Sequence, residues 1–265
     1  MGLLTSKIKC GNTSFTHFYL CPYLPLAAGT DALSLSLIRF KQRVQPDLDA
    51  WIECSCQLLG SIPFSPDTII IRPLRHDETT VRTDFPSALD LLGSSLAPHL
   101  GCRYFPALLS KSRATLPNKH LTREQRRSQL HDVYQLAPAS PGPASHVPAN
   151  PASAPKAAAP SSPGPVLPLP PPINPCTPFL LIDDILTTGA TMRALIQILR
   201  HHYPACPIKV FTLTRAGYSG KIPAHAGTQA LSDTGYHSIS DSHAVSPAQN
   251  SSLETLKSLI IANTV

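Results

Sequence analysis

The sequence predicts an α/β protein: an open parallel sheet flanked by helices and interrupted by a Pro/Ala-rich insertion. Two observations lead to this class. Residues 179–213 read in order as an apolar strand (Phe179–Ile182), a polar loop (Asp183–Thr191), an amphipathic helix (Thr191–His201) and a second apolar strand (Ile208–Leu213). Such a unit joins two parallel strands through a right-handed crossover. Residues 67–71 form a short run, Asp-Thr-Ile-Ile-Ile, which is typical of a parallel strand buried on both faces.

The spacing of apolar residues predicts the helices that cover this sheet. Leu33, Leu37 and Phe40 recur at intervals of three or four residues, as on one face of a helix. The same spacing returns over residues 48–59 and 88–100. We expect all three segments to pack an apolar side against the strands.

Composition divides the chain into a domain and three further segments. We assign residues 30–216 to the domain and 1–29 to an N-terminal segment outside it. Residues 137–178 hold 15 of the 29 prolines, with Ala and Ser between them. Such a segment buries too little surface to offset its ordering entropy, which predicts disorder or polyproline-like chain; the alternative is an ordered surface loop. Residues 217–265 form a polar tail, in which Leu253–Ala262 predicts a short helix.

The overall composition indicates a protein of the reducing cytoplasm. A formal charge of +6 favours anionic partners such as phosphates or nucleic acid. The seven cysteines include no Cys-x-x-Cys pair, which argues against a disulfide framework and against a four-cysteine zinc site. No signal peptide and no apolar run of the ~20 residues of a membrane span is found. We therefore expect no membrane partner.

Residues 179–191 carry the chemistry, with the sequence Phe-Leu-Leu-Ile-Asp-Asp-Ile-Leu-Thr-Thr-Gly-Ala-Thr. The strand delivers Asp183 and Asp184 to the carboxyl edge of the sheet, where α/β proteins bind ligands. The loop then enters a helix whose first, unpaired amides can bind phosphate, and Gly189 lets the backbone approach it closely. The hydroxyl donors of the loop are Thr187, Thr188 and Thr191. The alternative is a solvated strand end followed by an ordinary helix cap.

This string resembles the motif by which type I phosphoribosyltransferases bind phosphoribosyl pyrophosphate (PRPP): an apolar strand, two acids, two residues and Thr-Thr-Gly-x-Thr. The resemblance implies the type I phosphoribosyltransferase-like fold, with PRPP as the ligand. It also implies that Asp183 and Asp184 contact the ribose hydroxyls as the catalytic pair. The residues implied to cradle the 5′-phosphate are Thr187, Thr188, Gly189, Ala190 and Thr191. Mg²⁺ is the implied cofactor, bound mainly through PRPP itself.

A second region resembles the ComF-type phosphoribosyltransferases, a competence family. From Lys111 to Leu121 the chain is similar to that family's Arg-x-Arg-x-Thr-x-x-Gln-x-x-Leu pattern, with Lys111 at the first Arg and Asn118 at the Gln. In the Glu-Arg-x-x-Asn-Val pattern that follows, Gln125 stands for Glu and Gln129 for Asn. The resemblance extends over roughly the whole predicted domain, without the insertion.

Three cations are candidates for pyrophosphate binding. Arg72 follows the first predicted strand, where type I enzymes bind pyrophosphate; the alternative is an exposed loop residue. Lys111 and Arg113 belong to a basic segment that we interpret as a flexible loop closing over pyrophosphate; the alternative is a solvated cationic helix face. The zinc module of the ComF family is reduced to Cys10 and Cys21, so we expect no protein-bound metal.

Two functions follow from these expectations. The first is transfer of phosphoribosyl from PRPP to an unknown nitrogen nucleophile, with release of pyrophosphate. The second is a non-catalytic PRPP- or nucleotide-binding accessory protein in competence, DNA uptake or DNA utilisation. Direct nucleic-acid binding through residues 103–127 ranks last, because the basic residues there are not interleaved with aromatic ones and no recognised module is present. A homodimer is compatible with the sequence.

Overall fold

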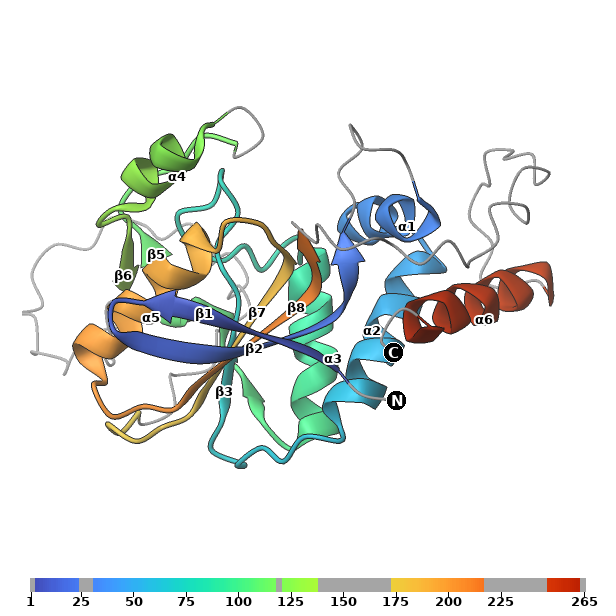
Figure 1. The fold of residues 1–265 in the computed structure, drawn as a ribbon, viewed down its shortest axis with the longest axis horizontal. Coiled ribbons are helices and arrows are strands. Elements are labelled where there is room, and N and C mark those ends of the chain that lie inside the picture. Colours follow the sequence, from blue (N-terminus) through green and yellow to red (C-terminus); the bar gives the residue numbers. More distant parts are fainter. Residues whose placement is uncertain (1–2, 24–30, 118–120, 138–172, 217–246, 263–265) are drawn as a thin grey trace, which may run out of the picture.

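The computed structural model describes residues 3–23, 31–117, 121–137, 173–216 and 247–262. Its centre is a six-stranded sheet with the order β1-β2-β8-β7-β3-β4 (Figure 1). Every neighbouring pair in it is parallel except β1 with β2. The predicted fold class, an α/β protein with a mainly parallel sheet flanked by helices, is confirmed.

Strands β7 (Phe179–Leu186) and β8 (Ile208–Ala216) lie side by side at the centre, joined by helix α5 (Ala190–His202). The predicted strand–loop–helix–strand unit is therefore present, with its two strands parallel. The first strand is longer than expected, because it continues past Ile182 to Leu186 and contains both acids. The loop that we predicted from residue 183 onward is shorter, spanning residues 187–189.

The two faces of the sheet are covered by different elements. One face packs against α1 (Ala32–Lys41), α2 (Asp47–Leu59) and α3 (Ala88–Leu100). The other packs against α5 and against the hairpin β5–β6 (Leu109–Lys111 and Tyr134–Leu136). The short strands β3 (Ile69–Ile71) and β4 (Arg103–Tyr104) complete the sheet, the 3-10 turn η2 (Pro106–Leu108) follows β4, and α4 (Arg123–Leu130) precedes β6.

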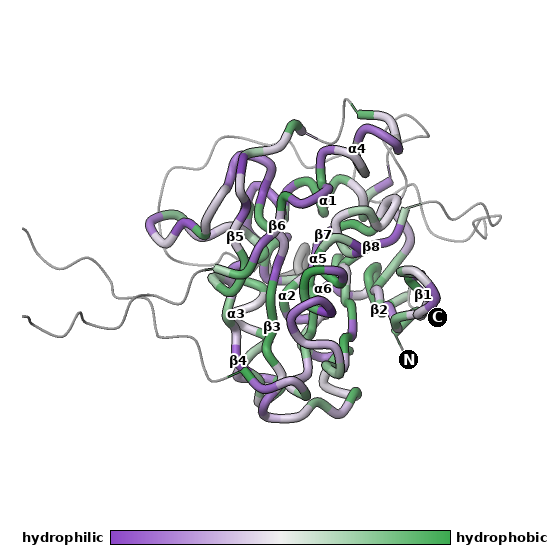
Figure 2. The backbone as a smooth tube through the Cα atoms, turned by 90° about the vertical axis from the view of Figure 1, so that its left-hand side faces the viewer, coloured by the Kyte–Doolittle hydropathy of each residue, from purple (hydrophilic) through white to green (hydrophobic). Residues whose placement is uncertain are grey.

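The core follows from alternation of side chains along the central strands. In β7, Phe179 and Leu181 join the apolar cluster on the α5 face, whereas Leu180 and Ile182 join the cluster on the α1–α3 face. Figure 2 shows apolar residues along the sheet and the helices beside it, while α4 is hydrophilic. The fully apolar run of β7 is thus explained by burial on both faces.

The N-terminal segment is part of the sheet, which corrects our assignment of residues 1–29 to a region outside the domain. Strands β1 (Leu4–Cys10) and β2 (Thr13–Tyr23) form a hairpin, and β2 pairs in parallel with β8. The hairpin turns at Gly11, whose φ of 57° favours glycine. Buried and more exposed residues alternate in the first part of β2, as in a strand with one buried face. One of the buried residues is His17, so the pattern of apolar residues is interrupted in the sequence.

His17 is fully buried and links three strands. The Thr212 hydroxyl donates to the carbonyl of Thr214, so it accepts a hydrogen bond from Nε2 of His17 at 2.8 Å. The other ring nitrogen, Nδ1, then accepts from the Ser6 hydroxyl at 2.8 Å. Burial, followed by the charge of Arg215, lowers the pKa of His17 to about 4. The histidine is therefore neutral in the folded protein near pH 7.

The C-terminal tail contributes one helix, α6 (Pro247–Ala262), which packs against α2 and buries Ile260. A helix at Leu253–Ala262 is confirmed, although it begins six residues earlier than expected. Residues 138–172, which hold most of the Pro/Ala-rich insertion, and residues 217–246 of the tail lie outside the described residues. Among the described helices, none combines the length and the apolar character needed to span a membrane.

We predict that the protein loses stability in acid because of His17. Between the unfolded pKa of about 6.5 and the folded pKa of about 4, the unfolded chain binds a proton that the folded chain excludes. The free energy of unfolding should therefore fall by up to about 3 kcal/mol as the pH drops through this window. Urea unfolding at several pH values, on the native chain and on His17→Gln, isolates the effect. An equally steep pH dependence in the variant would contradict it.

Candidate functional site

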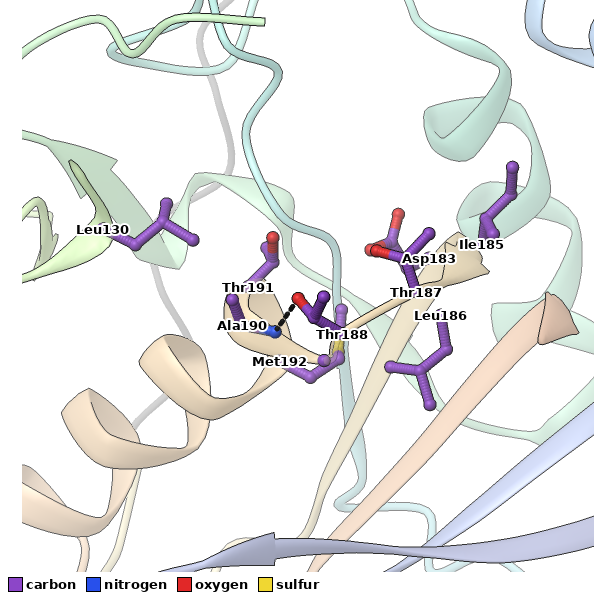
Figure 3. Close-up of a pocket in the computed structure, with 10 residues that line it drawn as sticks. Leu130, Asp183, Ile185, Leu186, Thr187, Thr188, Ala190, Thr191 and Met192 are labelled. Atoms are coloured by element: carbon purple, nitrogen blue, oxygen red, sulfur yellow. Dashed lines mark hydrogen bonds between the residues drawn. The ribbon is translucent and has the colours of Figure 1, made fainter. Parts of the chain in front are cut away.

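The candidate site lies where β7 ends and α5 begins, at the carboxyl edge of the parallel sheet (Figure 3). A small hollow is formed there by Asp183, by the whole stretch from Ile185 to Met192, and by Leu130 at the end of α4. Its free space is about 20 Å³, which is room for a water-sized group. A complete sugar phosphate would lie mostly outside it, with only one end group held by the loop.

The loop is arranged to present backbone amides. Gly189 is the N-cap of α5 with a φ of 70°, a left-handed conformation that favours glycine. As glycine has no side chain, the first turn of α5 receives no side-chain cap from it. The amide of Ala190 donates a long hydrogen bond of 3.4 Å to the Thr188 hydroxyl (Figure 3). An anion placed here meets the positive end of the helix dipole.

Arg193 lies directly behind this loop, and the sequence analysis missed it. Its guanidinium donates to the carbonyl of Thr188. If residue 189 carried a Cβ atom, that atom would lie 3.4 Å from Nη1 of Arg193, so the guanidinium is close to the glycine. A positive charge in the first turn of a helix interacts unfavourably with the helix dipole. The position of Arg193 in the first turn of α5 is therefore a sequence signal for an anionic neighbour.

The two acids do not point into the same space. Asp183 lines the hollow, whereas Asp184 pairs with Lys41 at the end of α1, with 2.9 Å between Oδ2 and Nζ. The backbone amide of Asp184 donates to the Asp183 carboxylate at 2.9 Å. Because neighbouring residues of a strand face opposite sides of the sheet, Asp183 is directed to the hollow at the loop of residues 187–189 and Asp184 is not.

The environment changes the protonation of this group of residues. Burial, followed by the charge of Asp184, raises the pKa of Asp183 to about 8. For Lys41, burial lowers the pKa, but the contact with Asp184 and the charge of Asp183 outweigh it, so the pKa is raised. Near neutral pH, these shifts favour a charged Lys41, which contacts Asp184, and an Asp183 that carries a proton.

Arg72 has a structural role, which corrects both of our interpretations of this residue. Its side chain is fully buried, so it is no exposed loop residue. All five of its N–H groups are used, by the carboxylates of Asp90 and Glu78 and by the carbonyl of Pro73. Since no donor is left, Arg72 cannot bind pyrophosphate in this conformation. Tyr104 joins the network by donating to Asp90 at 2.7 Å.

The basic segment is also different from our prediction. Lys111 lies in strand β5 and is only 4% exposed, so the prediction of a flexible loop at this residue is wrong. Its ammonium donates to the carbonyl of Arg75 at 2.6 Å, and burial lowers its pKa to about 8. Arg113 is exposed two residues later. Pyrophosphate binding by Arg113 stays a prediction.

Metal ligands are sparse at this edge of the sheet. Within the part of the chain that the structure describes, no three or more His, Cys, Asp or Glu residues gather closely enough to hold a metal ion. Asp183 is the one carboxylate that lines the hollow. A Mg²⁺ ion near the loop would therefore take most of its oxygen ligands from a bound phosphate ester.

Comparison with known proteins finds similar solved structures, of which two adenine phosphoribosyltransferases are examples. No protein-family model and no curated protein matches the sequence. Adenine phosphoribosyltransferase from Leishmania tarentolae is 12% identical with a TM-score of 0.36, over 80% of this chain and 94% of its own. Adenine phosphoribosyltransferase from Leishmania donovani is 13% identical with a TM-score of 0.37, over 86% of this chain and 96% of its own.

We predict that Asp183→Asn makes the protein more stable at neutral pH. Because the folded pKa of Asp183 is raised above the unfolded value, ionising it destabilises the fold increasingly from about pH 4 to about pH 8. The variant should gain at least about 1 kcal/mol at pH 7.5, with the gain vanishing near pH 4. Thermal unfolding at both pH values checks this. A gain that is the same at the two pH values would point to a packing effect instead.

We predict that Arg72→Met destabilises the fold by about 3–5 kcal/mol, because Glu78 and Asp90 would lose their buried cation. Denaturant unfolding measures the change. The matched control is Arg103→Met. Arg103 pairs with the exposed Asp67, with 3.6 Å between Nη2 and Oδ1. The free energy of unfolding of this control should change by less than about 1 kcal/mol. Equal losses in the two variants would contradict the structural role of Arg72.

Proposed function

We propose that this chain is a PRPP-binding, phosphoribosyltransferase-like protein of the ComF type, which transfers phosphoribosyl to an unknown nitrogen nucleophile and releases pyrophosphate. One observation carries the proposal. The left-handed Gly189 begins α5 without a side-chain cap of its own, and the helix N-terminus lies in the same hollow as Asp183, at the carboxyl edge of a parallel sheet. Anion-binding amides and a ribose-binding acid are thus next to each other, as a sugar phosphate requires.

The loop is suited to the 5′-phosphate of PRPP. Its amides and the hydroxyls of Thr188 and Thr191 line the hollow, and Arg193 supplies a positive charge behind it. Asp183 lies on the side from which the ribose would extend, and a protonated carboxyl can donate to a ribose oxygen as well as accept. Because the free space has room only for a water-sized group, the phosphate would sit at the mouth of the hollow and the remainder of the ligand would reach out over the edge of the sheet.

Catalysis in this proposal requires little proton chemistry. As pyrophosphate leaves the ribose, positive charge develops on the sugar, so the site must hold the ribose in position and exclude water. Asp183 and the loop perform the positioning. Mg²⁺ bound to the ligand would supply the charge that the departing pyrophosphate needs.

A second candidate is a PRPP- or nucleotide-binding protein without turnover, serving competence, DNA uptake or DNA utilisation. The specific observation in its favour is that two cations expected at the pyrophosphate are engaged elsewhere. Arg72 has all of its donors in a buried network, and Lys111 is held in β5. Arg113 is the exposed member of the three. Direct nucleic-acid binding and homodimer formation stay proposals of lower rank.

The main proposal predicts that Gly189→Val abolishes PRPP binding while the fold stays intact. A β-branched residue is strained at a φ of 70°, so the loop must change its conformation. Calorimetric titration with PRPP and Mg²⁺ measures the loss. The matched control is Gly101→Val, because Gly101 has a φ of 64° at the end of α3, has open space around it and lies outside the site. Equal PRPP affinity in both variants would rule out the loop as the binding site.

Pyrophosphate release separates the two functions. The native chain is incubated with PRPP, Mg²⁺ and a panel of nucleobases and other nitrogen nucleophiles. Release that depends on one nucleophile supports the transferase. Tight PRPP binding in the calorimeter without release on any of them supports the accessory protein, and absence of binding overturns both.

A further inference from the structure

Lys41 is the last residue of α1, and the packing of that helix fixes where its side chain begins. Leu37 and Phe40, one turn and one residue before it, are buried in the core of the α1–α3 face. The indole of Trp51 on α2 donates to Ser36 at 3.0 Å and ties the two helices together. The lysine therefore projects from a rigid base rather than from a loop.

The lysine reaches the acids from a different element than the phosphate loop. Its ammonium lies 2.9 Å from the Asp184 carboxylate and also feels the charge of Asp183, with Tyr23 at the end of β2 nearby. Arg39, in the same last turn of α1, points elsewhere and pairs with Asp47. The other cation of this helix end is thus not directed at the site.

The ion pair of Lys41 and Asp184 reduces the negative charge of the site. PRPP carries several negative charges, and two ionised carboxylates next to its phosphate loop would repel it. With Lys41 in place, the charge of Asp184 is balanced by an ion pair, and the charge of Asp183 is suppressed by burial. The other groups near the acids are Tyr23 on β2, Thr214 on β8, which donates to the main-chain carbonyl of Asp184, Tyr134 on β6, and Arg72 directly after β3. Among these, Arg72 is the one further cation, and its donors are used by Glu78, Asp90 and Pro73.

We propose that Lys41 is a positioning residue of the PRPP site: its ion pair holds Asp184 in place and balances its charge, so that an anionic sugar phosphate can bind beside the two acids. The inference rests on the proposed function and adds a residue from α1 to a site otherwise built by β7, its loop and α5. It assigns to α1 a part in ligand binding in addition to its part in the core.

The test compares three variants of the full chain by calorimetric titration with PRPP and Mg²⁺ at pH 7.5. Lys41→Met should lower the affinity tenfold or more. Lys41→Arg should restore it to within about threefold of the native value, because the guanidinium keeps both charge and hydrogen bond. Arg39→Met, the matched control on the same turn of α1, should bind as the native chain does. Thermal unfolding of each variant shows whether the fold is retained.

A second readout distinguishes positioning from a general structural effect. In Lys41→Met the two acids lose their balancing cation, so PRPP affinity should fall more steeply between pH 6 and pH 8 than in the native chain. Native affinity in Lys41→Met overturns the inference and leaves the proposed function standing. A loss that Lys41→Arg does not rescue, or that Arg39→Met shares, also overturns it. A native chain that does not bind PRPP overturns the proposed function, and the role of Lys41 with it.

Discussion

Alternation of side chains along the central strand β7 is the constraint on which the rest of the structure depends. Four apolar residues, Phe179 to Ile182, are buried on both faces because β7 lies between β3 and β8 and is covered on both sides. The next two residues of β7 continue this alternation, so Asp183 and Asp184 are directed to opposite faces of the sheet. Asp183 then lines the hollow at the loop of residues 187–189, and Asp184 pairs with Lys41 of α1.

Two buried ionisable groups near the carboxyl edge of the sheet, Arg72 and Asp183, differ in how their charge is compensated. At Arg72, a cation is buried with two carboxylates and a tyrosine, and every donor is satisfied inside the protein. At Asp183, by contrast, the carboxylate is withdrawn from solvent without a cation of its own, which raises its pKa. The first arrangement stabilises the segment after β3. The second leaves a group whose ionisation is unfavourable in the folded protein, which is typical of a functional site.

Local patterns predicted the central unit well and the outer parts poorly. The run of β7, the loop with Gly189 and the apolar side of α5 are features of contiguous sequence, so their order and direction could be read from it. The N-terminal hairpin was missed because His17 is buried by partners on β1 and β8, far from it in the chain. Lys111 was assigned to a flexible loop because the basic segment lies in the same chain as the PRPP-like motif, whereas the structure places it in β5, paired with β6, with its ammonium on the carbonyl of Arg75.

The sequence by itself determined the class of fold, the parallel direction of β7 and β8, and the glycine at the turn from β7 into α5. These depend on hydrophobic period and backbone freedom, which act over a few residues. The tertiary structure decided that Lys41 meets Asp184, that Arg193 lies behind the loop and that Arg72 is buried with Glu78 and Asp90. Ion pairs between distant segments depend on how helices pack on the sheet, and no local pattern encodes that packing.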